Sequence, residues 1–266
     1  MMVICMFRNL ICPPLRLSIR HQITVSARGM GKGRNHLPDR WTDYIPVGKR
    51  IPGTRFITFK VPLKKVYENK LAPHERFSPE DLIQAIQNQN EELGLIVDLT
   101  CTTRYYWPKE LPKTLHYVKL FTAGQEIPND EVIFQFKCIV KQFLRENSDN
   151  EKLIGVHCTH GLNRTGYLVC RYLIDVADMV PSEAIEKFNK SRGHSIERKN
   201  YIDDLMYGVT RTNSGLDKPR LLPPLATHQP HIPHTMDDET HACHPHPRQD
   251  HHRRHHHHHP WPHRYS

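Results

Sequence analysis

Short apolar runs alternate with longer helical repeats through the middle of this chain. The runs predict strands at Arg55–Leu63, Leu93–Leu99, Leu115–Phe121 and Leu153–Val156. Apolar residues at helical spacing predict a helix that begins at Ser78 and further helices at Asn129–Glu146, Tyr167–Val176, Pro181–Asn189 and Lys199–Val209. Strands that alternate with helices indicate an α/β layer fold, in which helices flank a mainly parallel central sheet. About 170 residues are enough for a single domain with one sizeable core.

Composition and charge divide the chain into three parts. Residues 1–38 contain six Lys or Arg and no Asp or Glu, whereas residues 213–266 are rich in Pro and hold 14 of the 21 His. Low hydrophobicity and frequent proline cannot support packing. We therefore predict a disordered basic leader over 1–38, a folded domain over 39–212 and a disordered tail over 213–266. The net charge of +9 comes largely from the leader, so it does not by itself indicate nucleic acid.

The leader has two interpretations. Its first 29 residues are rich in Arg, contain Ser and lack acids, which is typical of a mitochondrial transit peptide. However, Pro13 and Pro14 interrupt any amphipathic helix, and a second start codon position, Met30, stands just before the predicted domain. We favour an upstream extension over a targeting segment.

The strand at Leu153–Val156 runs into the loop HCTHGLNRT (His157–Thr165), and a helix follows. This arrangement points backbone N–H groups at an anion. Converging amides lower a cysteine pKa, and the thiolate is the attacking form, so Cys158 is the candidate nucleophile. Arg164 can grip two phosphate oxygens with its planar guanidinium. A buried structural cysteine beside a surface arginine is the alternative, but this spacing is much more specific than either residue alone.

The other loop residues would support this chemistry. The Thr165 hydroxyl can hydrogen-bond the sulfur and help it leave a thiophosphate intermediate, and Gly161 lets the chain turn closely around a phosphate. His157 is expected to support the loop by hydrogen bonding. The predicted phosphate-binding residues are Thr159, His160, Gly161, Leu162, Asn163 and Arg164.

HCTHGLNRTG resembles the signature loop of the cysteine-dependent phosphatases, HC-x5-R-[ST]. Within that superfamily the chain is most similar to the RNA 5′-triphosphatase branch. This branch includes the triphosphatase domain of animal mRNA capping enzymes and phosphatases that interact with RNA–protein complexes. The resemblance covers Trp41 to about Thr212, and includes RWTDYIPVGKRIPGTRFITFKVPL and IVDLTCTTRYYWPKEL. It implies the cysteine-phosphatase fold.

Protein phosphatases of the superfamily usually carry an aspartic general acid on a loop before the long helix. Here that region reads FTAGQEIPND, with Gly124 and Gln125 about where the acid would stand. Glu126 and Asp130 are nearby, but Asp130 fits better as an acid in the first turn of a helix. A serine or tyrosine leaving group needs a proton, whereas RNA leaves as a diphosphate whose terminal phosphate has a pKa of about 6. An empty acid position therefore favours phosphoanhydride cleavage.

Four basic residues are candidate RNA contacts. Arg104 lies in RYYW, where a cation among aromatics could grip phosphates or stack a base, although the aromatic side chains could equally lie in the core. SRGHSIERKN brings Arg192, Arg198 and Lys199 together. The resemblance implies that this loop contributes an arginine to the site, and Arg192 is the best match; an ordinary basic loop is the alternative.

Asp98 ends a predicted strand at the sheet edge where sites of open α/β folds lie. Its carboxylate could orient Arg164, Arg104 or a water, or it could hold a turn through its own backbone. The predicted catalytic residues are Cys158, Arg164, Thr165, His157 and Asp98.

Together these features predict an RNA 5′-triphosphatase and diphosphatase that needs no metal or other cofactor. Cys158 would attack the terminal phosphorus, RNA would leave as diphosphate, and water would hydrolyse the cysteinyl phosphate. The resemblance implies that the β-phosphate is removed as well, and that ribonucleoprotein or splicing proteins are partners besides 5′-triphosphorylated RNA. We expect a monomer without a membrane span that acts in the nucleus, with the cytoplasm as a further location.

Three other functions compete with this prediction. A dual-specificity protein phosphatase would need the general acid that the chain lacks. A phosphoinositide phosphatase is disfavoured because the signature loop has no lysines. A catalytically dead module that binds phosphorylated RNA would have no need of both Cys158 and Arg164.

Overall fold

One parallel sheet organises the part of the chain that the structure, a computed structural model, describes: residues 36–217. Its strands are β1 (Phe56–Lys60), β2 (Leu93–Asp98), β3 (His116–Lys119) and β4 (Leu153–Cys158). They stand in the order β1-β4-β2-β3 and pair in parallel. β2 and β4 are central and buried along their whole length, which is why their sequences are continuous apolar runs. The predicted fold class is confirmed.

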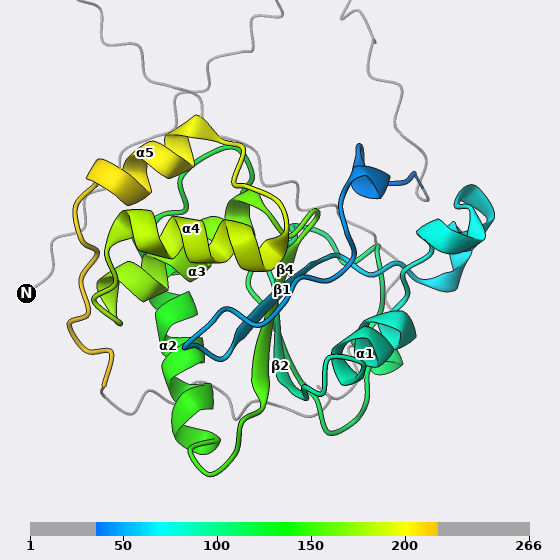
Figure 1. The fold of residues 1–266 in the computed structure, drawn as a ribbon, viewed down its shortest axis with the longest axis horizontal. Coiled ribbons are helices and arrows are strands. Elements are labelled where there is room, and N and C mark those ends of the chain that lie inside the picture. Colours follow the sequence, from blue (N-terminus) through cyan, green and yellow to red (C-terminus); the bar gives the residue numbers. More distant parts are fainter. Residues whose placement is uncertain (1–35, 218–266) are drawn as a thin grey trace, which may run out of the picture. The chain divides into compact units, whose positions relative to one another are not determined.

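Helices cover both faces of this sheet. They are α1 (Pro79–Gln87), α2 (Asp130–Glu146), α3 (Asn163–Asp175), α4 (Pro181–Arg192) and α5 (Lys199–Tyr207). Short 3₁₀ turns precede α1 at Trp41–Asp43, Lys65–Lys70 and Pro73–Glu75, and another lies between β2 and β3 at Pro108–Glu110. Figure 1 shows α1 on one side of the sheet and the other four helices gathered on the opposite side. Each predicted helix and strand has a counterpart in the structure.

Local sequence signals set the helix ends. At the start of α1, the Ser78 hydroxyl accepts the N–H of Asp81 while the Asp81 carboxylate accepts the N–H of Ser78. The side chain of Asn129 accepts the N–H of Val132 at the start of α2. Gly193, with φ of +76°, ends α4 in the left-handed conformation. In contrast, no described side chain caps α3, which begins at the signature loop.

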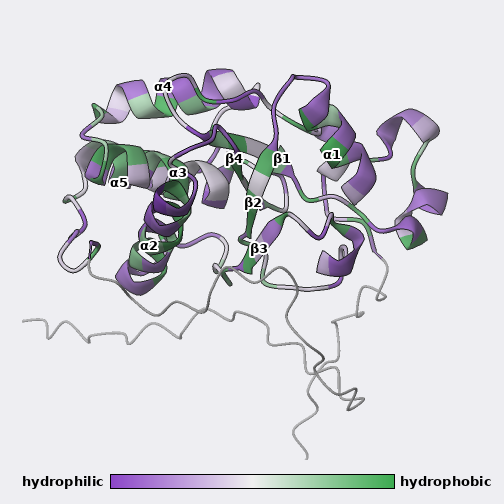
Figure 2. Ribbon diagram, turned by 90° about the horizontal axis from the view of Figure 1, so that it is seen from below, coloured by the Kyte–Doolittle hydropathy of each residue, from purple (hydrophilic) through white to green (hydrophobic). Residues whose placement is uncertain are grey.

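Two apolar cores hold the layers together. One lies between the sheet and the group α2, α3, α4 and α5, and the other lies between the sheet and α1. Figure 2 shows the apolar stripes of these helices beside the apolar strands. Because the strands are parallel, the carboxyl ends of β1, β2 and β4 meet at one edge of the sheet, between the two cores.

The segment before β1, residues 41–51, wraps over this edge and is called the wrap below. Trp41 and Tyr44 are buried, and the Trp41 Nε1–H donates to the Val61 carbonyl at 2.9 Å. Lys60 holds the wrap in place. Its Nζ lies 3.6 Å from the centre of the Trp41 ring and donates to the carbonyls of Trp41 and Tyr44.

The folded domain continues past the predicted boundary at residue 212. Leu216 is buried, and Asn213 accepts a hydrogen bond from the Nζ of Lys137 at 3.0 Å. The predictions for the leader through residue 35 and for the tail from residue 218 lie outside the described residues. Within residues 36–217, no helix is both long and apolar enough to cross a membrane.

Candidate active site

The predicted signature loop connects the end of β4 to the start of α3. Cys158 is the last residue of β4 and is only 4% exposed, and Asn163 is the first residue of α3. Gly161 turns the chain between them with φ of +69°, and a Cβ there would collide with the Phe59 carbonyl. Only glycine can therefore follow this path without strain.

The surroundings of Cys158 favour its thiolate. Burial alone would raise the pKa of the thiol, but the Arg164 guanidinium, the Thr165 hydroxyl and the backbone N–H groups of Thr165 and Leu162 together lower it below its ordinary value. The Thr165 hydroxyl is buried and has no nitrogen or oxygen partner among the described residues, which leaves it available to the sulfur. A thiolate of this kind is the form that attacks phosphorus.

Arg164 is held beside the loop by carbonyls from two neighbouring strand ends. Its Nη1 donates to the carbonyl of Leu99 at 3.2 Å, just after β2, and to that of Thr122 at 3.0 Å, after β3. Its Nη2 donates to the Thr159 hydroxyl at 3.1 Å. The guanidinium plane is thus oriented before any phosphate arrives, which lowers the cost of gripping one.

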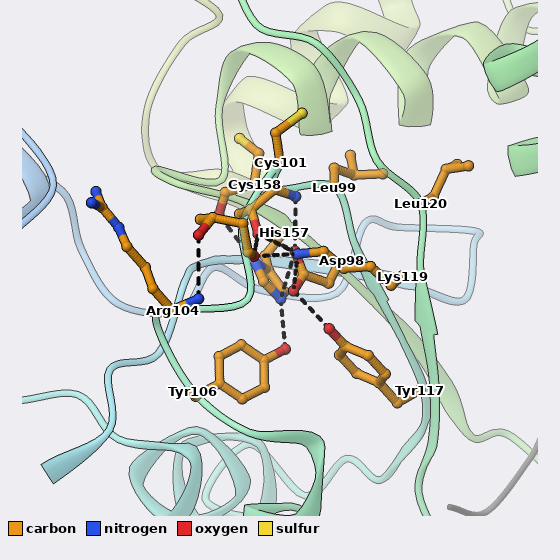
Figure 3. Close-up of polar contacts among 12 residues, drawn as sticks. Asp98, Leu99, Cys101, Arg104, Tyr106, Tyr117, Lys119, Leu120, His157 and Cys158 are labelled. Carbon is orange, nitrogen blue, oxygen red and sulfur yellow. Dashed lines mark hydrogen bonds and ion pairs between the residues drawn. The ribbon is translucent and has the colours of Figure 1, made fainter. Parts of the chain in front are cut away.

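His157 supports the loop from behind, as Figure 3 shows. Its Nδ1–H donates to the Cys158 carbonyl at 3.1 Å, and its Nε2 accepts the Tyr106 hydroxyl at 2.8 Å. Burial lowers the pKa of His157, although Asp98 opposes this, so the ring is neutral. These contacts correspond to the supporting role expected from the sequence.

Asp98 holds a turn and does not orient Arg164 or Arg104. One carboxylate oxygen accepts the backbone N–H and the hydroxyl of Thr100, both at 2.8 Å, and the other accepts the Tyr117 hydroxyl at 2.8 Å and the Lys119 Nζ at 3.0 Å. Burial alone would raise the pKa of Asp98, but His157, Lys119 and the Thr100 N–H lower it. A carboxylate kept ionised in this way is unsuited to donate a proton.

The remaining loop side chains contact the protein around the loop. The Asn163 side chain accepts the N–H groups of Glu197 and Arg198 at 2.9 and 3.0 Å, and His160 Nε2 bonds to the Asp39 carbonyl at 2.7 Å. Leu162 is fully buried. The contribution of these residues to phosphate binding would therefore come from their backbone amides.

The structure separates the four predicted RNA contacts. Arg198 lies at the start of α5, directly beside Asn163, and Lys199 next to it is 86% exposed and pairs with Asp203 at 2.7 Å. The Arg104 side chain points away from Cys158 in Figure 3, and its Nη2 donates to the Tyr105 hydroxyl at 3.2 Å.

Arg192 is not a surface residue, which corrects the interpretation of its basic loop. It is the last residue of α4 and has an exposed fraction of 0%. The side chain donates to three backbone carbonyls, those of Gly161, His160 and Ile45. Its Nε and Nη2 are thus directed at the backbone of the signature loop and of the segment before β1, and not at the protein surface.

The loop between β3 and α2 carries no carboxylate at the predicted acid position. Gly124 and Gln125 occupy it, and Gln125 has φ of +73°, with its carbonyl held by the Asn200 side chain at 3.0 Å. Asp130 begins α2, is 83% exposed and pairs with Arg211 at 3.3 Å. Glu126 is exposed on the same loop.

Several contacts at the site had no signal in the sequence. The Thr122 carbonyl that holds Arg164, the Tyr106 hydroxyl on His157 and the Lys119 ammonium on Asp98 come from residues without a motif. Across residues 36–217, no three His, Cys, Asp or Glu side chains gather in a way that could hold a metal ion.

Comparisons with known proteins agree with this geometry. Residues 78–209 match the family model described as "Dual specificity phosphatase, catalytic domain". The RNA/RNP complex-1-interacting phosphatase of Mus musculus is 64% identical over 189 residues, which cover 71% of this chain and 59% of that protein. The chain thus spans about three fifths of the length of that relative.

Two further relatives are covered more completely. The RNA/RNP complex-1-interacting phosphatase homolog of Caenorhabditis elegans is 47% identical, over 64% of this chain and 74% of that protein. A tyrosine-protein phosphatase of Autographa californica nuclear polyhedrosis virus is 39% identical, over 64% of this chain and 98% of that protein. With its signature loop, parallel sheet and these relatives, the chain belongs to the dual-specificity family of cysteine-dependent phosphatases.

Proposed function

We propose that this phosphatase removes the γ-phosphate, and then the β-phosphate, from the 5′ end of triphosphorylated RNA. The observation that carries the proposal is the empty acid position at Gly124 and Gln125, together with the ionised state of Asp98. Neither feature provides a proton for an alkoxide or phenoxide. A diphosphate leaving group has a terminal pKa of about 6 and departs without one.

The chemistry would proceed in two steps at Cys158. The thiolate attacks the terminal phosphorus, the bond from phosphorus to the bridging oxygen breaks, and RNA leaves as a 5′-diphosphate. Arg164 and the loop amides hold the three peripheral oxygens through this step. Water then attacks the cysteinyl phosphate and releases inorganic phosphate and the thiolate, with the Thr165 hydroxyl stabilising the sulfur.

We further propose that Arg198 and Lys199 contact the rest of the 5′ end. Arg198 adjoins the signature loop through Asn163, and Lys199 opens toward solvent beside it. Phosphates that precede the first nucleotide would contact guanidinium and ammonium groups there. The names of the mouse and worm relatives further support RNA–protein complexes as partners. A nuclear location is a separate proposal, which fluorescence microscopy of the tagged full chain would test.

A second candidate is a protein phosphatase acting on phosphotyrosine or phosphoserine. It is favoured by the family model and by the viral relative, whose name is tyrosine-protein phosphatase. In that case the leaving group would need an acid from elsewhere on the acid loop, such as Glu126.

Release of labelled phosphate distinguishes the two functions. The substrates are RNA with a γ-labelled 5′-triphosphate and a phosphotyrosine peptide, each assayed with a chelator present. We expect a much larger kcat/KM for the RNA, unchanged by chelator and by Glu126→Gln. Comparable values for both substrates, with Glu126→Gln slowing only the peptide, would instead identify a protein phosphatase.

A further inference from the structure

Arg192 contacts the outer side of the signature loop at two consecutive residues. Its Nε donates to the Gly161 carbonyl at 3.1 Å and its Nη2 to the His160 carbonyl at 2.9 Å. A third carbonyl of the loop, that of Thr159, is taken by the backbone N–H of Val61 at 3.1 Å. Three successive peptide oxygens of the loop are therefore held on the same outer side.

Peptide planarity transmits these contacts to the inner side of the loop. In a trans peptide the carbonyl of one residue and the N–H of the next point in opposite directions. Fixing the carbonyls of His160 and Gly161 outward therefore aims the N–H groups of Gly161 and Leu162 inward. The Leu162 N–H is one of the groups that lower the pKa of the Cys158 thiol.

We infer that Arg192 is a positioning residue, which aims the phosphate-binding amides of the signature loop through the carbonyls of His160 and Gly161. It acts on the cysteine and phosphoryl group through the loop, without touching RNA. This role holds for any phosphate substrate, so it does not rest on the RNA specificity proposed above.

Packing alone does not account for an arginine at this position. Burial lowers the pKa of Arg192 to about 10, and its Nη1 has no partner among the described residues. Both features cost folding free energy that an apolar side chain of similar volume would avoid. The Cys158 thiolate partly offsets that cost, because its charge favours the protonated guanidinium. The reciprocal effect is that Arg192 favours the thiolate.

The same guanidinium also joins the loop to the wrap before β1. Nη2 donates to the Ile45 carbonyl at 2.8 Å as well as to His160, so the wrap and the loop share one donor group. Gly161 leaves room for it, since a Cβ there would lie 3.0 Å from the Arg192 Nε. The loop, the wrap and the end of α4 are thus fixed relative to one another through a single side chain.

The test compares Arg192→Lys and Arg192→Met with Arg171→Met. Arg171 is the matched control, because it is 1% exposed and ion-paired to Asp175 but makes none of the hydrogen bonds to the signature loop. Two quantities are measured for each full-length variant. They are kcat/KM, for a small aryl phosphate and for 5′-triphosphorylated RNA, and the pH midpoint of iodoacetamide alkylation of Cys158. Thermal unfolding follows stability separately.

We expect both Arg192 variants to lose about a hundredfold in kcat/KM, the usual effect of misplacing a site by an ångström. Arg192→Lys should lose as much activity as Arg192→Met, because the point charge of a lysine cannot bridge the two carbonyls as the planar guanidinium does. The alkylation midpoint should move to higher pH in both variants. Arg171→Met should lower the melting temperature while its midpoint stays at the wild-type pH.

Wild-type activity on the aryl phosphate and an unmoved midpoint in either Arg192 variant would overturn the inference. Loss confined to RNA substrates would likewise overturn it, because Arg192 would then be an RNA contact. If the methionine variant does not fold, the lysine variant, which keeps the buried charge, decides the question by the same two measurements. Failure of RNA cleavage in the wild-type enzyme would count against the proposed function alone.

Discussion

At the scale of single residues, two buried thiols show how the site makes a nucleophile. Cys158 and Cys170 are both buried in the same core. Burial raises the pKa of Cys170 far above its ordinary value, because only Arg171 opposes it weakly. At Cys158, Arg164, Thr165 and the loop amides reverse the effect of burial. Local hydrogen bonds and charge, and not depth, decide which thiol reacts.

Cys158→Ser should reduce turnover by about three orders of magnitude or more while leaving a folded protein, because the hydroxyl is a poor nucleophile of nearly the same size. Phosphate release and thermal unfolding are the measurements. Cys170→Ser is the matched control and should keep its activity. Substantial phosphate release by Cys158→Ser would remove Cys158 from the mechanism.

Arg164→Lys should lower activity and also raise the pH at which Cys158 is alkylated. The sign follows from the lowered pKa of Cys158: the thiolate is populated below the ordinary thiol pKa, and Arg164 is the main charge that favours it. A lysine keeps a charge but loses the contacts to Leu99 and Thr122. An alkylation profile identical to that of the wild-type enzyme would show that Arg164 does not act on the thiol.

Sequence reasoning at this scale succeeded where a motif exists and failed where a contact is made by the fold. The spacing of Cys158 and Arg164 carries its own chemistry, and the structure brings them together. Nothing in SRGHSIERKN distinguishes a buried Arg192 from a half-buried Arg198, because both are basic residues in a polar segment. The burial of Arg192 depends on the Ile45 and Gly161 carbonyls, which the sequence does not bring near it.

At the scale of elements, the wrap before β1 depends on a lysine that is costly to keep charged. Burial lowers the pKa of Lys60 to about 8, with Arg192 adding to the effect. In the unfolded chain its pKa is about 10.4. Between these values the unfolded chain binds more protons, so the free energy of unfolding should rise with pH from about 8 to about 10.4. Below pH 8 the full cost of the buried charge is present.

Lys60→Met should remove this dependence. Urea unfolding of the wild-type and variant proteins at several pH values from 7.5 to about 10 provides the measurement. We expect the wild-type protein to gain stability relative to Lys60→Met as the pH rises through this window. Parallel stability curves for the two proteins would show that Lys60 does not titrate in the folded wrap.

Most helices and strands could be predicted because their periodic pattern of apolar residues extends over many positions. α2 shows this best, since apolar residues recur at helical spacing along Asp130–Glu146, although Lys137 is buried among them. The short 3₁₀ turns at Lys65–Lys70 and Pro73–Glu75 have too few residues for a period. The sequence pattern also ended α4 three residues early, at Asn189, because the polar residues before Gly193 carry no apolar signal.

At the scale of the whole molecule, the segment after α5 is tied to the domain by buried charges. Lys137 is 0% exposed, pairs with Asp175 at 2.7 Å and donates to the carbonyls of Arg211 and Thr212. Lys137 also donates to the side chain of Asn213, which the predicted domain end at residue 212 left out. A polar segment gives no sequence sign that a distant lysine needs its oxygen atoms. The segment belongs to the fold, although it carries no helix or strand.

Truncation after residue 217 should leave stability and activity on short RNA almost unchanged. Truncation after residue 208 should lower the free energy of unfolding by about 1–3 kcal/mol, because Lys137 loses three acceptors in a buried place. Chemical denaturation of both truncated proteins is the measurement. Equal stability of the two would mean that these contacts contribute nothing.

The central claim is that the enzyme works without a general acid. The dependence of its rate on the pKa of the leaving group tests this most directly. The measurement is kcat/KM for a series of aryl phosphates whose phenols span a wide range of pKa, with Glu126→Gln as the matched variant. Without an acid, charge on the leaving oxygen is not neutralised, so kcat/KM should fall steeply as the phenol pKa rises, equally in both proteins. A flat dependence in the wild-type enzyme that becomes steep in Glu126→Gln would contradict the claim.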